Sequence, residues 1–184
     1  MNSTVFIILL AIFCFFEQDY FSKFLSNYKE FSPYLVIEKG EVIRLISSNL
    51  FHINLLHLLI NLYTFWNVST RIEKMYRETY MLLLLNTAIL TNIINILISL
   101  IWFYFYNDFS NYYLHSLGLN NTIFAFRALY YEKLDRNLSL FGIIIHSSYI
   151  IWFDLFLVYL FTPNSNFIGH ISGITAGRLI NNIF

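Results

Sequence analysis

The chain is a succession of long apolar runs separated by shorter polar segments. A bilayer core about 30 Å thick needs about 20 helical residues to cross it. Apolar runs that approach or reach this length lie at residues 4–16, 50–68, 79–106, 117–131, 140–161 and 167–184. The pattern predicts an all-α integral membrane protein with six transmembrane helices. We expect a single transmembrane domain over residues 1–184, without a linker or an internal repeat.

The first run, at residues 4–16, is short, and a signal peptide is the alternative interpretation. It lacks the basic start and the clean small-residue cleavage site of a signal peptide. We therefore interpret it as a short first span.

Composition narrows the class of protein further. Hydrophobic residues make up 58% of the chain and charged residues only 12%, whereas soluble domains carry about a quarter charged residues. The 11 basic and 11 acidic residues balance and form no dense basic patch, which argues against nucleic-acid binding. The lone Cys14 supports neither a disulfide framework nor a cysteine metal site. We expect no metal and no cofactor.

The loops fall into two groups, those that carry Lys and Arg and those that carry none. One group lies between spans two and three and between spans four and five: Arg71, Lys74, Arg77, Arg127, Lys133 and Arg136. The loops after spans three and five contain no Lys or Arg. The positive-inside rule therefore places the basic loops in the cytoplasm.

Spans four and six are too short for a full crossing. Their candidate helices, 118–131 and 169–184, measure about 21 Å and about 24 Å. Both start on the non-cytoplasmic side, so their first residues are expected below the membrane surface. Irregular backbone at that depth requires burial in protein or contact with water. We expect an internal, water-accessible cavity open to the non-cytoplasmic face.

Two polar residues lie deep in the second span. His57 and Asn61 are four residues apart and so share one helix face, about 40° apart. Polar side chains at such depth usually face the interior of the bundle. They are candidates for a functional site, and the alternative is that they only hydrogen-bond neighbouring helices.

The sixth span carries a glycine stripe with a histidine beside it. Gly169, Gly173 and Gly177 recur every four residues, and His170 is adjacent to the stripe. Such a stripe lets another helix approach closely. The fourth span begins after Gly118, and the free N–H groups at a helix start could bind a carbonyl oxygen or an anion.

These residues together resemble the rhomboid family of intramembrane serine proteases. The family's HxxxxHxxxN spacing is present as His52, His57 and Asn61, its GxSG element aligns with Gly118, Leu119, Asn120 and Asn121, and its GHxxGxxxG element is present as Gly169, His170, Gly173 and Gly177. The resemblance runs from about Gly40 to the C-terminus, and the segment LFTPNSNFIGHISG is most similar to endoplasmic-reticulum rhomboids of animals.

The resemblance implies a six-helix rhomboid-like bundle and a role for each matching residue. The family uses a Ser at the start of the fourth span as nucleophile and a His in the sixth span as base. By position, His170 is the base, and Asn120 occupies the nucleophile position. His57 and Asn61, with backbone N–H groups near Gly118 and Leu119, are the oxyanion donors.

The departure at Asn120 decides the expected function. A carboxamide has no hydroxyl proton that a base can remove, so covalent catalysis is lost. We expect a pseudoprotease in the lipid bilayer that binds transmembrane segments of client proteins, with Asn120 hydrogen-bonded to His170. By resemblance, the endoplasmic reticulum is a candidate location.

Two other interpretations stay open. An active serine endopeptidase that cleaves membrane-protein substrates would need a substitute nucleophile, for which the candidates are Ser116, Thr122 and Ser172. A small transporter would line its path with polar residues such as His57, Asn61, Asn86, Asn92 and Asn95. The last three do not form one helical stripe, so a continuous polar path is not evident.

Overall fold

Each of six long helices in the described residues overlaps one of the six apolar runs. The computed structural model describes the chain except for residues 1, 18–25, 141, 163–164 and 184. The long helices are α1 (Ser3–Phe16), α4 (Leu55–Tyr76), α5 (Tyr80–Tyr106), α7 (Asn120–Leu134), α8 (Ser147–Phe161) and α9 (Phe167–Asn181). The shorter elements are η2 (Ser26–Tyr28), α2 (Pro33–Ile37), α3 (Arg44–Ser47), η3 (Arg77–Thr79) and α6 (Ser110–Tyr113), where η denotes a 3-10 helix.

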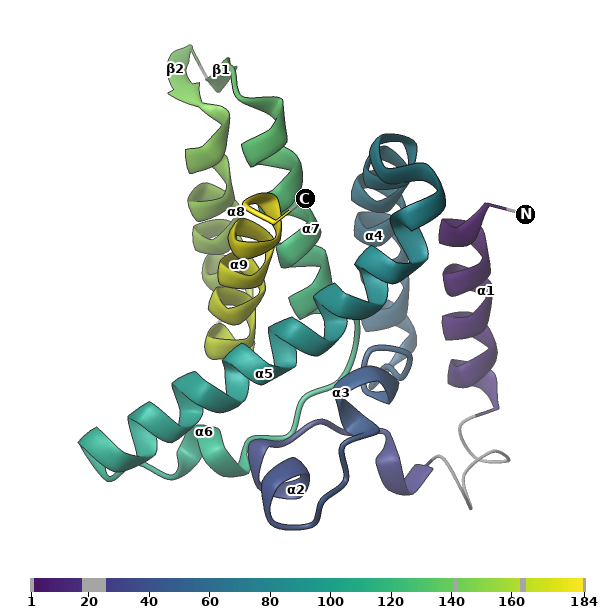
Figure 1. The fold of residues 1–184 in the computed structure, drawn as a ribbon, viewed down its shortest axis with the longest axis vertical. Helices are drawn as coiled ribbons and strands as arrows, with labels where there is room; N and C mark the ends of the chain where they lie inside the picture. The colour runs from purple at the N-terminus through teal and green to yellow at the C-terminus, as the bar shows by residue number, and fades with distance from the viewer. Residues whose placement is uncertain (1, 18–25, 141, 163–164, 184) are drawn as a thin grey trace.

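Helix α7 lies at the centre of the bundle and packs against α4, α5, α8 and α9 (Figure 1). Its side chains from Thr122 to Phe126 are all buried, and a helix buried on every side is typical of a protein core. The ring of Phe126 stacks on that of Phe65 of α4, with the ring centroids 6.3 Å apart. Helix α1 packs on the other side of α4.

The glycine stripe of α9 lies in the contact with α7. A Cβ atom at Gly173 would lie 2.2 Å from the backbone oxygen of Asn121, and one at Gly177 would lie 2.1 Å from that of Ala125. Interiors are close-packed and backbone atoms cannot rotate away as side chains do. Glycine at these positions therefore lets the two helix backbones meet directly.

Two predicted boundaries change in the structure. The run predicted as span five from residue 140 begins instead with a hairpin, in which β1 (Asn137–Leu140) pairs antiparallel with β2 (Ile143–His146). The β-branched Ile residues of β2 read as a membrane segment by hydropathy, but they also favour strands. Gly142 has φ +82°, which a turn residue of this kind requires. The fold is helical as predicted, with this one small hairpin added among the described residues.

The second boundary is the start of α4, which lies five residues later than predicted. Asn54 accepts a hydrogen bond from the backbone N–H of His57 at 2.8 Å and so caps the helix at Leu55. The helix then continues to Tyr76, beyond the predicted end at residue 68.

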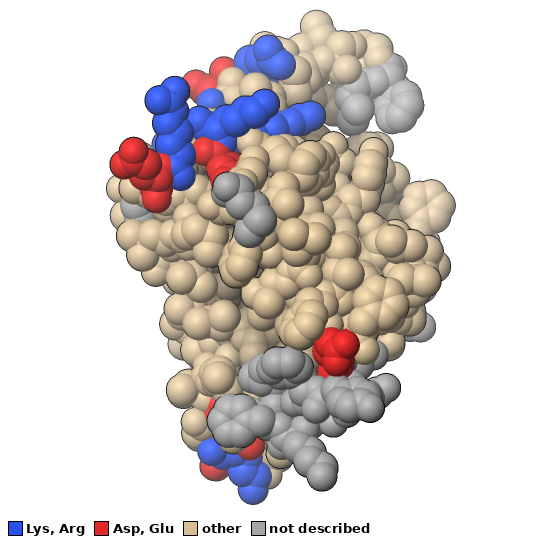
Figure 2. Space-filling view, turned by 90° about the vertical axis from the view of Figure 1, so that its right-hand side faces the viewer, with Lys and Arg blue, Asp and Glu red and all other residues tan. Residues whose placement is uncertain are grey.

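The distribution of apolar surface agrees with a membrane environment. One described helical stretch, Leu55–Tyr106, which contains α4 and α5, is long and apolar enough to cross a membrane by its length and composition. The apolar helices α1 and α8 are shorter. Figure 2 shows Lys and Arg gathered at the two ends of the molecule, with a broad belt of mostly uncharged residues between them. Crossing by all six helices stays a prediction.

A carboxylate of α4 holds the start of α1. Glu73 accepts hydrogen bonds from the backbone N–H of Ser3 at 2.7 Å and from the N–H and hydroxyl of Thr4 at 3.1 and 2.6 Å. A negative charge at a helix N-terminus is favourable because it pairs with the free N–H groups and the helix dipole. Burial on its own would raise the pKa of Glu73, but the hydrogen bonds from Thr4 and Ser3 together outweigh it and lower the pKa.

The lowered pKa of Glu73 predicts that acid weakens the attachment of α1. The stabilisation is present above the unfolded-state pKa and is lost as the pH falls through the folded-state value. We expect the protection of the amides in the first turn of α1, measured as their exchange rate relative to that of unstructured chain at the same pH, to fall on acidification below about pH 4. In Glu73→Gln this pH dependence should disappear, whereas Glu78→Gln, at an exposed carboxylate, should keep it. Retention of the full pH response in Glu73→Gln would contradict the assignment.

Candidate functional site

The start of α4 brings two histidine rings together against a glycine. His52 lies just before α4 and His57 in its first turn, with the ring centroids 5.3 Å apart. Gly118 has φ +97°, and a Cβ there would lie 3.0 Å from Cε1 of His57 and 3.3 Å from Cδ2 of His52. A side chain at position 118 would both strain the backbone and press on the two rings.

Asn120, the first residue of α7, reaches across to α4. Its Nδ2 lies 3.0 Å from Nε2 of His57. An amide nitrogen can only donate, so with the amide as placed His57 accepts at Nε2 and carries its proton on Nδ1. The expected partner of Asn120 was His170, and that expectation is wrong in the described residues: α7 starts with position 120 turned toward α4.

Asn61 lies one turn beyond His57 on the same face of α4 and is fully buried. Its Nδ2 donates to the backbone oxygen of His57 at 2.8 Å. Its Oδ1 is buried without a hydrogen-bond partner among the described residues. The donor group of this amide is therefore used within its own helix.

His170 occupies the first turn of α9, and its side chain is buried against α7. The ring lies on that of Phe124, with centroids 4.5 Å apart, and only 2% of the residue is exposed. Phe124 is four residues after Asn120, so the imidazole lies about one turn along α7 from the amide. The side chain of Asn121 lies against Gly169, where its Oδ1 would be 2.5 Å from a Cβ.

The loop that leads into α7 uses part of the expected oxyanion site for folding. The backbone N–H of Gly118 donates to the oxygen of Ser48 at 2.9 Å. Leu119 is buried and belongs to the hydrophobic core. The free donors at this end are the first N–H groups of α7, which have no partner within the helix.

The hydroxyl groups near the site are already engaged or lie outside α7. Thr122 donates to Oδ1 of Asn49 at 2.7 Å, and Ser172 donates to the backbone oxygen of Ile168 at 2.7 Å. Ser116 lies in the loop before α7, where its backbone pairs with Phe31. Two Asn residues of α5 make structural contacts: Asn92 donates to the backbone oxygen of Leu45 at 2.8 Å, and Oδ1 of Asn95 accepts from Ser99 at 3.3 Å. These contacts favour packing roles for them over a transport path.

Several buried polar atoms around this site have no hydrogen-bond partner among the described residues. They are Nδ1 and Nε2 of His52, Nδ1 of His57, Oδ1 of Asn61 and Nδ1 of His170. Each such atom costs about 1–3 kcal/mol if it stays unpaired. Such atoms in a native structure call for an explanation, such as a functional role or a bound water or ion. No group of three or more His, Cys, Asp or Glu placed for a metal is found among the described residues.

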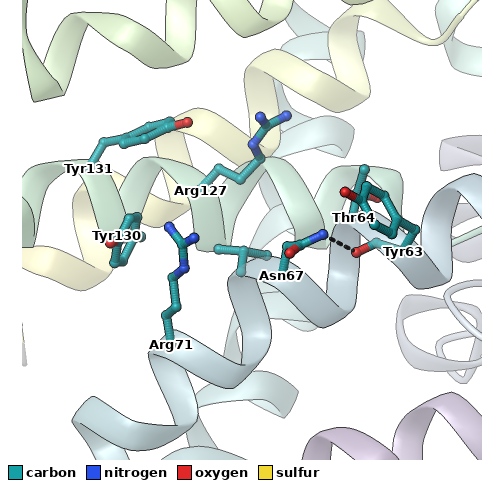
Figure 3. A pocket seen from close by; sticks show the side chains of 8 residues that line it. Tyr63, Thr64, Asn67, Arg71, Arg127, Tyr130 and Tyr131 are labelled. Carbon is teal, nitrogen blue, oxygen red and sulfur yellow. Dashed lines mark hydrogen bonds between the residues drawn. The ribbon is translucent and has the colours of Figure 1, made fainter. Parts of the chain in front are cut away.

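A pocket that the sequence pattern did not reveal lies elsewhere, between α4 and α7. It has a volume of about 290 Å³, and its lining includes Tyr63, Asn67, Arg71, Arg127, Tyr130 and Tyr131 (Figure 3). None of the predicted site residues lines it. Both arginines entered the sequence analysis only as loop charges. The four-residue spacing of Asn67 and Arg71, which puts them on one face of α4, is the signal that could have indicated it.

Comparison with known proteins identifies the family. A family model described as "Rhomboid domain" matches residues 39–184. The chain belongs to the rhomboid family. Rhomboids are helical membrane proteins that act on membrane-protein substrates within the bilayer, so this chain is an integral membrane protein.

A relative supports the same family. The rhomboid chain is 27% identical over 150 residues to a protein of Arabidopsis thaliana named "Rhomboid-like protein 14, mitochondrial". The alignment covers 80% of this chain and 45% of the relative, so the chain spans less than half the length of that protein.

Proposed function

We propose that this chain is a non-catalytic rhomboid that binds transmembrane segments of client membrane proteins. The observation that carries the proposal is at the start of α7. There Asn120, which the sequence resemblance aligns with the family's nucleophilic Ser, has its amide hydrogen-bonded to Nε2 of His57 at 3.0 Å.

Two chemical features of this site argue against catalysis: it lacks a nucleophile, and it lacks a free oxyanion donor at His57. The carboxamide of Asn120 has no hydroxyl proton for His170 to remove, and its nitrogen is delocalised, so it is not a nucleophile. His57 accepts from Asn120 at Nε2 and therefore presents no N–H there to a developing oxyanion. Removal of one oxyanion donor costs about 10²–10³ in rate, and removal of the nucleophile in a comparable serine protease costs about 10⁶.

The other components of the site are also engaged in the fold. The amide of Asn61 donates to the backbone of α4, and the N–H of Gly118 donates to Ser48. The hydroxyls of Thr122 and Ser172 donate to other groups. These contacts support a site that binds without acylation.

Client binding is supported by the unpaired polar atoms. A transmembrane helix that is broken by Gly or Pro exposes backbone N–H and C=O groups, which need partners inside the membrane. The buried atoms of His52, His57, Asn61 and His170 that lack partners offer such contacts. We infer that the preferred client is a transmembrane segment with a weakened helix.

The proposal also covers the membrane topology of the chain and its organelle. We place six spans in one domain, with the basic loops on the cytoplasmic side, on the positive-inside rule. Two features point to different organelles for the chain. The segment LFTPNSNFIGHISG resembles endoplasmic-reticulum rhomboids, whereas the Arabidopsis relative is named mitochondrial.

Purified full-length chain in proteoliposomes tests the proposal. We expect it to bind a fluorescent transmembrane peptide with a central Gly-Pro break more tightly than a matched poly-Leu peptide. We also expect neither cleavage of the peptide nor labelling by a fluorophosphonate, because no hydroxyl is activated. Cleavage that is lost in His170→Ala would contradict the proposal, and labelling at Ser116 or Ser172 would identify an active protease instead.

A further inference from the structure

The pocket between α4 and α7 lies in the opposite half of the bundle from the His57–Asn120 pair. Arg71 is ten residues beyond Asn61 on α4, which is about 15 Å along the helix axis. Arg127 is seven residues beyond Asn120 on α7, about 10 Å along its axis. The pocket therefore belongs to the end of the bundle that carries the basic loops, and it is separate from the site described above.

The pocket carries excess positive charge. Arg127 pairs with Asp154 of α8, with Nη2 and Oδ2 3.0 Å apart. Arg71 is exposed, lies over the ring of Tyr130 at 5.1 Å, and has no carboxylate within 4.0 Å among the described residues. The pocket and its surroundings thus hold two guanidinium groups and one carboxylate, which leaves the charge of Arg71 uncompensated. Figure 3 shows both side chains at the pocket, with the guanidinium of Arg71 beside Tyr130 and that of Arg127 directed away from it.

The polar groups of the pocket suit a phosphate. Guanidinium groups match phosphate oxygens with two parallel hydrogen bonds and remain charged at any physiological pH. The aromatic ring under Arg71 orients that group by a cation–π contact. The phenol group of Tyr63 lines the same pocket and can donate a further hydrogen bond.

The face of α4 that carries Arg71 is polar at its charged end and apolar further along the helix. A phospholipid has the same order, with a polar headgroup followed by apolar acyl chains. Arg71 and Asn67 lie at the charged end, and Tyr63 beside them is 72% exposed. Further along the same face of α4, Ile60 and, one turn beyond it, Leu56 are 54% and 67% exposed. The spacing of four, then seven, then four residues keeps Leu56, Ile60, Asn67 and Arg71 on one face. Apolar side chains thus continue directly from a cationic pocket.

We propose that this pocket binds the headgroup of an anionic phospholipid from the leaflet on the side of the basic loops. The phosphate contacts Arg71 and Arg127, and an acyl chain lies along Ile60 and Leu56. Basic pockets between transmembrane helices on the cytoplasmic or matrix side are suited to such headgroups. A free phosphate or an acidic peptide would use the arginines but not the apolar stripe, so the stripe favours the lipid.

Native mass spectrometry of the purified full-length chain tests this proposal with phosphatidic acid and with phosphatidylcholine of the same acyl chains. We expect tighter binding of phosphatidic acid. Arg71→Gln should weaken it about fivefold, as the loss of one cation near a lipid surface predicts. The matched control is Lys74→Gln, an exposed cation one turn further on α4 and outside the pocket, which should retain the affinity.

Two competitors identify the source of the anion. Inorganic phosphate and a soluble acidic peptide should leave the lipid bound, because neither has an acyl chain to place on the apolar stripe. Displacement of the lipid by either one would overturn the assignment to a phospholipid. Equal losses in Arg71→Gln and Lys74→Gln would reduce the effect to general surface charge and would also overturn it. Neither outcome bears on the client site at His57 and Asn120.

Discussion

Replacing Asn120 with Ser and Asn121 with Gly is expected to produce a rhomboid that a fluorophosphonate labels and that cleaves a transmembrane peptide. The new hydroxyl supplies a proton for a base to remove and an oxygen that can attack. Loss of the Asn120 amide also frees Nε2 of His57, which can then carry a proton and donate to an oxyanion. Gly at position 121 removes the side chain that lies against Gly169, next to His170.

The expected gain is large because a nucleophile and an oxyanion donor return together. We expect a cleavage rate at least about a thousandfold above that of the unmodified chain. The matched control is Asn120→Ala with Asn121→Gly, which also frees His57 but adds no hydroxyl, and it should stay inactive. Adding His170→Ala to the Ser variant should abolish the labelling. If the Ser and Ala variants behave alike, position 120 is not the nucleophile position and the proposed function loses its basis.

Gly173→Ala is expected to cause a large loss of stability for the addition of a single methyl group. The new Cβ would lie 2.2 Å from the backbone oxygen of Asn121, so α7 and α9 must separate. Overpacking of this kind costs about 1–3 kcal/mol, and contact with an immobile backbone atom favours the upper end. Replacing glycine within a helix returns only about 1 kcal/mol. We expect the free energy of unfolding to fall by about 2 kcal/mol.

Equilibrium unfolding in mixed detergent micelles, followed by tryptophan fluorescence, measures this loss. Thr175→Leu is the control, because Thr175 is exposed on the other face of α9 and should tolerate added bulk within about 0.5 kcal/mol. A Gly173→Ala protein as stable as the unmodified chain would show that the two helices do not meet as closely as described.

The helical part of the fold could be predicted because its signal is local. Each of the six long helices overlaps an apolar run, and the periodicity that places His57 and Asn61 on one face of α4 depends only on the helical repeat. The glycine stripe of α9 could be recognised for the same reason. The hairpin before α8 could not, because its Ile-rich strand has the same hydropathy as a membrane helix and hydropathy ignores backbone propensity.

The partners within the site depended on more than spacing. The sequence placed Asn120 and His170 in corresponding positions of a known dyad, and their pairing was the natural expectation. Which neighbour a side chain meets depends on the rotation and axial offset of one helix against another. In the structure the rotation and offset of α7 bring the Asn120 amide into hydrogen-bond contact with His57. They also bring the Asn121 side chain against Gly169.

The sequence by itself determined the class of this protein: a helical membrane chain with rhomboid motifs in order, because hydropathy and helical period act over a few neighbouring residues. Only the tertiary structure decided that Asn120 is hydrogen-bonded to His57 and that Arg71 and Arg127 line the same pocket. Both facts join helices α4 and α7, whose residues are separated by more than forty positions, and contacts at that distance arise from packing rather than from local pattern.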